Sequence, residues 1–244
     1  MSGNNYDERA VFNARRKKRR RKIVLRRWFM CFLAVVMVVS LTYCGVMVYG
    51  FFNPEIYKSD IISGIYGDGI SKKVEKALEL TLPDWVDVQL ISKHNTARTG
   101  MKLKDIKNIV IHYVGNPKTT AQNNRDYFNK LDTSVSSHFV VGLEGEIIQC
   151  VPLYERSAAS NERNKDTISI EVCHPDETGK FNESTYESVT KLTAWLCNEF
   201  SLDETDIIRH YDITGKICPK YYVENEDAWL TLKQDVKESL ESEN

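Results

Sequence analysis

The sequence predicts an α/β fold, a single domain with a central mixed β-sheet flanked by helices, preceded by an N-terminal transmembrane helix. Two observations lead to this prediction. Residues 28–52 form an uncharged apolar run, and from residue 85 onward short β-branched runs alternate with amphipathic helical stretches. Six cysteines in 244 residues are too few for a disulfide-dense scaffold, and 42% hydrophobic with 27% charged residues excludes a wholly disordered chain.

Charge is distributed unevenly along the chain. Residues 1–27 hold 11 Lys and Arg against two acidic residues, a net charge of +9, whereas the remaining 217 residues carry a net charge of −10. A basic cluster next to a membrane span stays on the cytoplasmic side. We therefore expect residues 1–27 to form a cytoplasmic tail that also meets anionic lipid. A basic run can also bind nucleic acid, but beside a span the topological role is favoured, and we expect no nucleic-acid partner.

The apolar run at residues 28–52 is 25 residues long, which is enough for a helix to cross a hydrocarbon core of about 30 Å. The alternative is a cleaved secretory signal peptide, whose apolar region usually has about 7–15 residues and ends at a small-x-small site. This run is longer, and residues 46–49 at its distal end are bulky. The favoured interpretation is an uncleaved anchor, a single-pass protein of the cell membrane with its N-terminus cytoplasmic and the domain after residue 52 extracellular.

Residues 53–84 predict a stalk with a short helix over 71–80, and residues 85–244 predict the folded domain. Short β-branched runs predict strands at 108–114, 167–172 and 206–211, and a hairpin over 138–151 that turns at 143–146. Helical spacing and capping residues predict helices at 119–131, 182–200 and 227–240.

One loop near the C-terminus carries the strongest chemical signal. His210 lies near the end of a predicted strand, and Cys218 follows eight positions later, across a loop that contains Gly215. A neutral imidazole and a thiolate are good ligands for Zn²⁺. A third ligand must come from elsewhere, and the best candidate is His112, at the end of the 108–114 strand. Two histidines and one cysteine leave a fourth position open, as in catalytic sites; the alternative is an ordinary loop histidine and a buried cysteine.

Four segments together resemble the zinc N-acetylmuramoyl-L-alanine amidases, a superfamily of phage lysozyme-type amidases, bacterial autolysins and animal peptidoglycan recognition proteins. In chain order they are IVIHYVGNP, SSHFVVGLEGEIIQCVP, ISIEVCHP and RHYDITGKICPKYY. The resemblance covers roughly residues 86–240, and its most specific element is the pattern H-x6-K-x-C-P. It implies Zn²⁺ on His112, His210 and Cys218. It also implies peptidoglycan as the substrate, cut between N-acetylmuramic acid and the L-alanine of the stem peptide.

The resemblance also implies two catalytic residues. Glu171, in the strand ISIEV, corresponds to a general base or water-orienting carboxylate. Lys216, two residues before Cys218, corresponds to a lysine suited to stabilising an oxyanion. The alternatives are a surface carboxylate at a strand end and a solvated loop lysine.

The sequence departs from the family pattern in two places. Ser137 stands where some phage-type members have a tyrosine that takes part in catalysis. We therefore expect Glu171 to perform this role without help from a tyrosine. Residues 158–161 read Ala-Ala-Ser-Asn, whereas many relatives have a Trp-His pair near this point that contacts substrate. The first departure concerns catalysis, and the second concerns the fine shape of the substrate groove.

Four further residues are candidates for substrate binding. Tyr113, Asn116 and Asn161 are placed to touch glycan or peptide, although each is equally a turn residue. His138 is predicted to line the groove or to support a metal ligand, the alternative being simple packing. His94 and His174 receive no role.

The cysteines and the rival functions leave alternatives open. Cys150, Cys173 and Cys197 allow a disulfide outside the membrane, but they are equally well explained as small buried hydrophobic residues.

A non-catalytic peptidoglycan-binding receptor on the same fold is the main rival to an enzyme. Non-enzymatic relatives typically lose the cysteine ligand, and this chain keeps Cys218. A zinc peptidase that cuts within the stem peptide is a third possibility.

Overall fold

The computed structural model describes residues 22, 25, 28–33, 35–38, 40, 69–93 and 96–242. The chain divides into two units, residues 1–65 and 66–244. In the first unit the described residues are helical. Within the described part of the chain, no helix is both long and apolar enough to cross a membrane. Much of the predicted span over 28–52 lies outside the described residues, as do most of the predicted tail and residues 53–68 of the predicted stalk.

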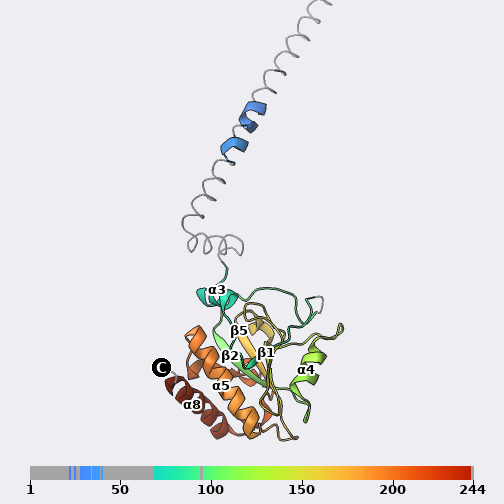
Figure 1. Ribbon diagram of the computed structural model, residues 1–244, viewed down its shortest axis with the longest axis vertical. Helices are drawn as coiled ribbons and strands as arrows, with labels where there is room; N and C mark the ends of the chain where they lie inside the picture. Colours follow the sequence, from blue (N-terminus) through green and yellow to red (C-terminus); the bar gives the residue numbers. More distant parts are fainter. Residues whose placement is uncertain are drawn as a thin grey trace, which may run out of the picture. The chain divides into compact units, whose positions relative to one another are not determined.

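In the second unit, six strands form one mixed sheet in the order β1-β4-β3-β5-β2-β6 (Figure 1). The strands are β1 (Val86–Val88), β2 (Asn108–Tyr113), β3 (Phe139–Val141), β4 (Ile147–Gln149), β5 (Thr167–Val172) and β6 (Ile207–Arg209). Only β3 and β4 pair antiparallel, as the predicted hairpin, and every other pair is parallel. The predicted α/β domain with a mixed central sheet is confirmed.

Helices cover both faces of this sheet. They are α3 (Lys72–Glu79), α4 (Ala121–Phe128), α5 (Glu183–Phe200), α6 (His210–Thr214), α7 (Lys220–Glu224) and α8 (Glu226–Ser242), with 3-10 turns η1 (Asn161–Lys165) and η2 (Glu204–Asp206). The long helix α5 begins where predicted because the Asn182 side chain accepts a hydrogen bond from the backbone N–H of Thr185 at 2.9 Å. Figure 1 shows α5 and α8 on one side of the strands and α4 on the other.

The two faces of the sheet differ in polarity. Successive side chains of a strand point to opposite faces, so Ile109 and Ile111 of β2 enter the main hydrophobic core together with Ile168 and Ile170 of β5. Residues of α5 and α8 complete this core. The intervening positions of the same two strands include His112, Ser169 and Glu171. The sheet therefore presents polar groups on the face opposite α5 and α8.

The end of β6 differs from the prediction. The strand stops at Arg209, and His210 is the first residue of α6 rather than part of a strand over 206–211. The Asp212 carboxylate accepts a hydrogen bond from the backbone N–H of Arg209 at 2.7 Å and pairs with its guanidinium group at 2.9 Å. These contacts cap the N-terminus of the short helix and so end the strand one residue before the histidine.

The folded domain also begins earlier than residue 85. Val74 and Ala77 of α3 are buried in the main core, and the backbone N–H of Ser71 donates to the carbonyl of Lys104 at 2.9 Å. Strand β1, which the sequence did not predict, pairs with β4 at the sheet edge. Helix α3 is therefore part of the domain rather than of a stalk over 53–84.

This packing predicts an effect of shortening Val74. Val74→Ala removes two buried methyl groups and should lower the free energy of unfolding by about 1–3 kcal/mol. The exposed Lys72→Ala change on the same helix should stay within about 0.5 kcal/mol of the parent. Urea denaturation measures both, and equal stability of the two variants would show that α3 contributes nothing to the core.

Candidate metal centre

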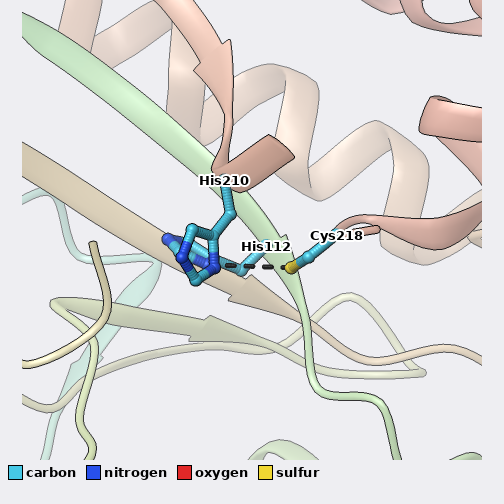
Figure 2. A group of neighbouring side chains, drawn as sticks. All are labelled: His112, His210 and Cys218. Atoms are coloured by element: carbon cyan, nitrogen blue, oxygen red, sulfur yellow. Dashed lines mark hydrogen bonds between the residues drawn. The ribbon is translucent and has the colours of Figure 1, made fainter. Parts of the chain in front are cut away.

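Three side chains from distant parts of the chain converge on one point. The donor atoms of His112, His210 and Cys218 all lie within 4.8 Å of one another, and all three residues are buried (Figure 2). The Cys218 Sγ atom is 3.8 Å from Nδ1 of His112, and the two imidazole centroids are 4.8 Å apart. The sequence-predicted ligand set is therefore brought together by the fold.

The parallel pairing of β5, β2 and β6 produces this convergence. These strands are neighbours in the sheet, so their carboxyl ends share one edge, where ligands of open α/β sheets usually bind. The Cα register places His112 opposite Glu171 and Ile111 opposite Arg209. His210 follows Arg209 directly, so it enters the same edge beside His112.

Cys218 reaches the site on the return of the loop that follows α6. Gly215 ends α6 with a φ of 76°, a left-handed conformation that suits glycine. The chain then turns back, and the backbone N–H of Tyr211 donates to the carbonyl of Cys218 at 3.0 Å. This hydrogen bond holds the start of α6 against the cysteine, which explains how two ligands eight positions apart face one ion.

Burial sets the protonation state of the histidines. It lowers the pKa of His112 well below its usual range, and the pKa of His210 is also lowered by burial and then by the positive charge of Lys216. Both imidazoles are therefore neutral near pH 7, the form that coordinates metals. The Nδ1 atom of His210 is buried and has no hydrogen-bond partner among the described residues.

The cysteine behaves differently. Burial, followed by the nearby Glu171 carboxylate, raises the pKa of Cys218 to about 12, so the metal-free side chain is a neutral thiol. A metal must displace this proton on binding. Two neutral imidazoles, a displaceable thiol proton and an unpartnered buried ring nitrogen fit Zn²⁺, which favours N and S donors.

Glu171 faces the same space. Its Oε2 atom is buried and makes no hydrogen bond among the described residues. Burial raises the pKa of Glu171 to about 8, while the charge of Lys216 lowers it. Near pH 7 most of the metal-free Glu171 side chain is therefore protonated, and its Oε2 atom, next to the metal donors, can exchange this proton with a substrate or water.

A cavity of about 1190 Å³ opens onto these residues. Its lining includes the three donors and five other residues predicted for the site: Tyr113, Asn116, Asn161, Glu171 and Lys216. Lys216 is exposed, so its ammonium group can reach a bound molecule. In this lining, Glu171 is the only Asp or Glu residue and Lys216 is the only Lys or Arg residue.

Part of the lining was not predicted. Helix α4 and the segments on either side of it supply a neutral wall that includes Thr119, Asn123, Asn124, Tyr127, Ser134 and Ser136. The only signal in the sequence was the polar character of residues 119–131, which is equally typical of a solvent-exposed helix.

His138 does not line this cavity. It is fully buried, its Nδ1 accepts from the backbone N–H of Ser169 at 3.0 Å, and its Nε2 donates to the carbonyl of Glu155 at 2.9 Å. Burial lowers its pKa to about 4. His138 is thus a neutral packing residue, which corrects its predicted substrate-binding role. The neighbouring Ser137 is also buried, and its hydroxyl donates to the carbonyl of Phe139.

The residues without predicted roles are placed as follows. His174 is buried, donates from Nδ1 to the carbonyl of Asp176 at 2.7 Å and stacks on Tyr113. His94 lies outside the described residues. Every cysteine in the described part of the chain is free, so no disulfide forms among them.

Comparisons with known proteins agree with this geometry. Residues 102–221 match the N-acetylmuramoyl-L-alanine amidase family model. The chain is 34% identical over 164 residues to the N-acetylmuramoyl-L-alanine amidase BlyA of Bacillus subtilis (strain 168), and 32% identical over 161 residues to CwlL of Bacillus licheniformis. Each match covers 59% of this chain but 44% of the relative, so the chain spans less than half the length of these proteins.

The fold is shared with solved structures. The catalytic domain of XlyA aligns with a TM-score of 0.55 over 62% of this chain and 98% of that domain, at 24% identity. The family match spans all three candidate ligands and both candidate catalytic residues. Over residues 102–221, the folded domain is therefore similar to the N-acetylmuramoyl-L-alanine amidase family.

Proposed function

We propose that this chain is a zinc-dependent amidase that hydrolyses the bond between N-acetylmuramic acid and L-alanine in peptidoglycan. The observation that carries the proposal is the buried cluster of His112, His210 and Cys218 beside an unpartnered Glu171. Both relatives described above are amidases by name. The family match over residues 102–221 and the site chemistry therefore support the same reaction.

The site residues have distinct roles in metal binding, proton transfer and charge stabilisation. His112, His210 and Cys218 would hold Zn²⁺, which supplies Lewis acidity toward an amide carbonyl and a water molecule. In its ionised form, which a nearby cation favours, Glu171 accepts a proton from the attacking water and returns it to the leaving amine, because its Oε2 atom has no competing partner among the described residues. Lys216, exposed at the cavity, stabilises negative charge on the carbonyl oxygen. The neutral polar lining offers hydrogen bonds to glycan and peptide groups.

The N-terminal region supports a membrane anchor. Residues 28–52 carry no charge and directly follow a strongly basic segment. In the described part of this run, large apolar side chains from Trp28 to Val38 are exposed, as a lipid-facing helix requires. The anchor would place the enzyme domain outside the cell, where mature peptidoglycan lies. Such a tether favours remodelling of wall close to the membrane over diffusive lysis.

Muropeptide digestion tests the reaction. With zinc, the protein should release free stem peptides that begin with L-alanine. The Cys218→Ser change removes a metal ligand, so it should weaken zinc binding by more than the roughly 10–100-fold that is typical when a hydrogen-bond partner of a ligand is removed. Cys197→Ser makes the same change at a buried cysteine outside the cavity lining and should keep both zinc and activity.

Mass spectrometry with parallel metal analysis reads out the products of this digestion. Intact muropeptide, bound but uncut at full zinc occupancy, would establish the receptor alternative. New amines within the peptide, with the muramyl link whole, would establish a peptidase.

The Glu171 environment predicts a pH-dependent stability difference. A buried carboxyl with a raised pKa stabilises the fold fully below the ordinary glutamate pKa, and this contribution is lost as pH rises through about 8. Glutamine does not ionise, so the Glu171→Gln variant does not share this loss. In metal-free protein, the Tm of the variant minus the Tm of the parent should therefore increase between pH 5 and pH 9. The same variant should keep zinc and lose turnover.

Thermal unfolding in the presence of a chelator measures this difference. Glu144→Gln, at an exposed carboxylate, should show the same Tm offset at both pH values. A Tm difference for Glu171→Gln that does not change with pH, or loss of zinc, would contradict the assigned role.

The anchor predicts a fractionation result. The full chain should sediment with membranes, resist extraction by high salt and dissolve in detergent, whereas a variant lacking residues 1–52 should not sediment. Immunoblotting of the fractions measures this. Mature protein free in the growth medium would contradict the anchor.

A further inference from the structure

Two neighbouring residues contact the Nε2 atoms of the two metal-site histidines. The Asn161 Oδ1 atom is 3.0 Å from Nε2 of His210. The Ser160 Oγ atom, fully buried, is 3.3 Å from Nε2 of His112. One short turn therefore touches both imidazoles, and neither contact follows from the family's metal-ligand pattern.

These contacts decide which ring nitrogen is free. A neutral imidazole carries one N–H, and the nitrogen without the proton is the one that donates to a metal. An amide oxygen accepts a hydrogen bond but cannot donate one, so Asn161 Oδ1 favours the proton on Nε2 of His210. The lone pair then lies on Nδ1, the buried atom without a partner among the described residues.

The Cys218 thiol and the Ser160 hydroxyl together hold His112. A neutral thiol can donate only to a ring nitrogen without a proton, and the hydroxyl can then accept from the opposite N–H of His112. Its Nδ1 atom faces the Cys218 sulfur at 3.8 Å, and its Nε2 atom faces the Ser160 hydroxyl. We propose that Asn161 and Ser160 are positioning residues that keep both imidazoles in the Nε2-protonated form and so present Nδ1 of each to the ion. This inference rests on the proposed metal centre and adds the residues that orient it.

The turn is built to hold these side chains. Asn161 has a φ of 52°, in the left-handed region that asparagine tolerates better than most residues. The Asn164 side-chain oxygen accepts from the backbone N–H groups of Ala159 and Ser160, at 3.1 and 2.7 Å. The backbone N–H of Arg163 donates to the Ser160 carbonyl at 2.9 Å. The backbone is therefore fixed independently of the histidines.

Two substitutions of Asn161 distinguish the effect of losing the hydrogen-bond acceptor from the effect of changing the backbone conformation. Asn161→Gly keeps the freedom to adopt a positive φ but removes the acceptor, whereas Asn161→Asp keeps both. Ser160→Ala removes the hydroxyl that faces Nε2 of His112, without requiring a change in φ. Ser201→Gly is the matched control, because Ser201 has a φ of 49° and lies outside the cavity lining.

Two measurements on the folded domain read the effect without using catalysis. Zinc dissociation constants come from competition with a chromogenic chelator, and the histidine tautomers of metal-free protein come from long-range ¹H–¹⁵N NMR correlations. Asn161→Gly should raise the zinc Kd by about 10-fold or more, in the range seen for partners of metal-bound histidines. It should also give His210 a mixture of tautomers. Asn161→Asp should keep the Nε2–H form and bind zinc at least as tightly as the parent, and Ser160→Ala should shift the tautomers of His112.

Wild-type zinc affinity and an unchanged Nε2–H signal in both Asn161→Gly and Ser160→Ala would overturn this inference, even if the parent cleaves muropeptides. An equal loss of zinc in Asn161→Gly and Ser201→Gly would also overturn it, because the effect would then come from the backbone. A parent protein that binds no zinc would instead refute the proposed function.

Discussion

The parallel pairing of β5, β2 and β6 is the constraint on which the site depends. Three consecutive strands of the sheet end at one level, so Glu171, His112 and His210 meet although about a hundred residues separate the first and last histidine. A register slip of one residue would turn His112 toward the apolar face beneath α5. The core residues Ile109, Ile111, Ile168 and Ile170, which alternate with the polar positions, fix that register.

The same edge carries an energetic cost. Burying polar atoms without hydrogen bonds destabilises a fold, and two such atoms, on Glu171 and His210, lie in the cavity lining. Unsatisfied groups of this kind are expected at a site that awaits a ligand, because a complete internal network would leave nothing to bind it. The network around His138 is the contrast: both of its ring nitrogens have protein partners, and it takes no part in the cavity.

Much of the fold was readable from the sequence because its strongest signals are local. Strand β5 matches its predicted bounds, and α5 begins beside its predicted cap, since β-branched runs and capping side chains act over a few residues. Strand β1 was missed because it has only three residues and one buried position. The three ligands were predictable from residue type and placement. The contacts of Asn161 and the burial of His138 were not, because both depend on which segment of the chain packs against which.

The buried cysteines of the domain affect how it would withstand oxidation outside the cell, where the proposed function places it. Burial raises the pKa values of Cys150, Cys173 and Cys197 to about 12, so almost none of these thiols is ionised at neutral pH. Oxidants and disulfide-forming enzymes attack the ionised form at accessible sulfur atoms. The domain can therefore persist in an oxidising environment with unpaired cysteines, and its maturation would need metal delivery but no oxidative folding machinery.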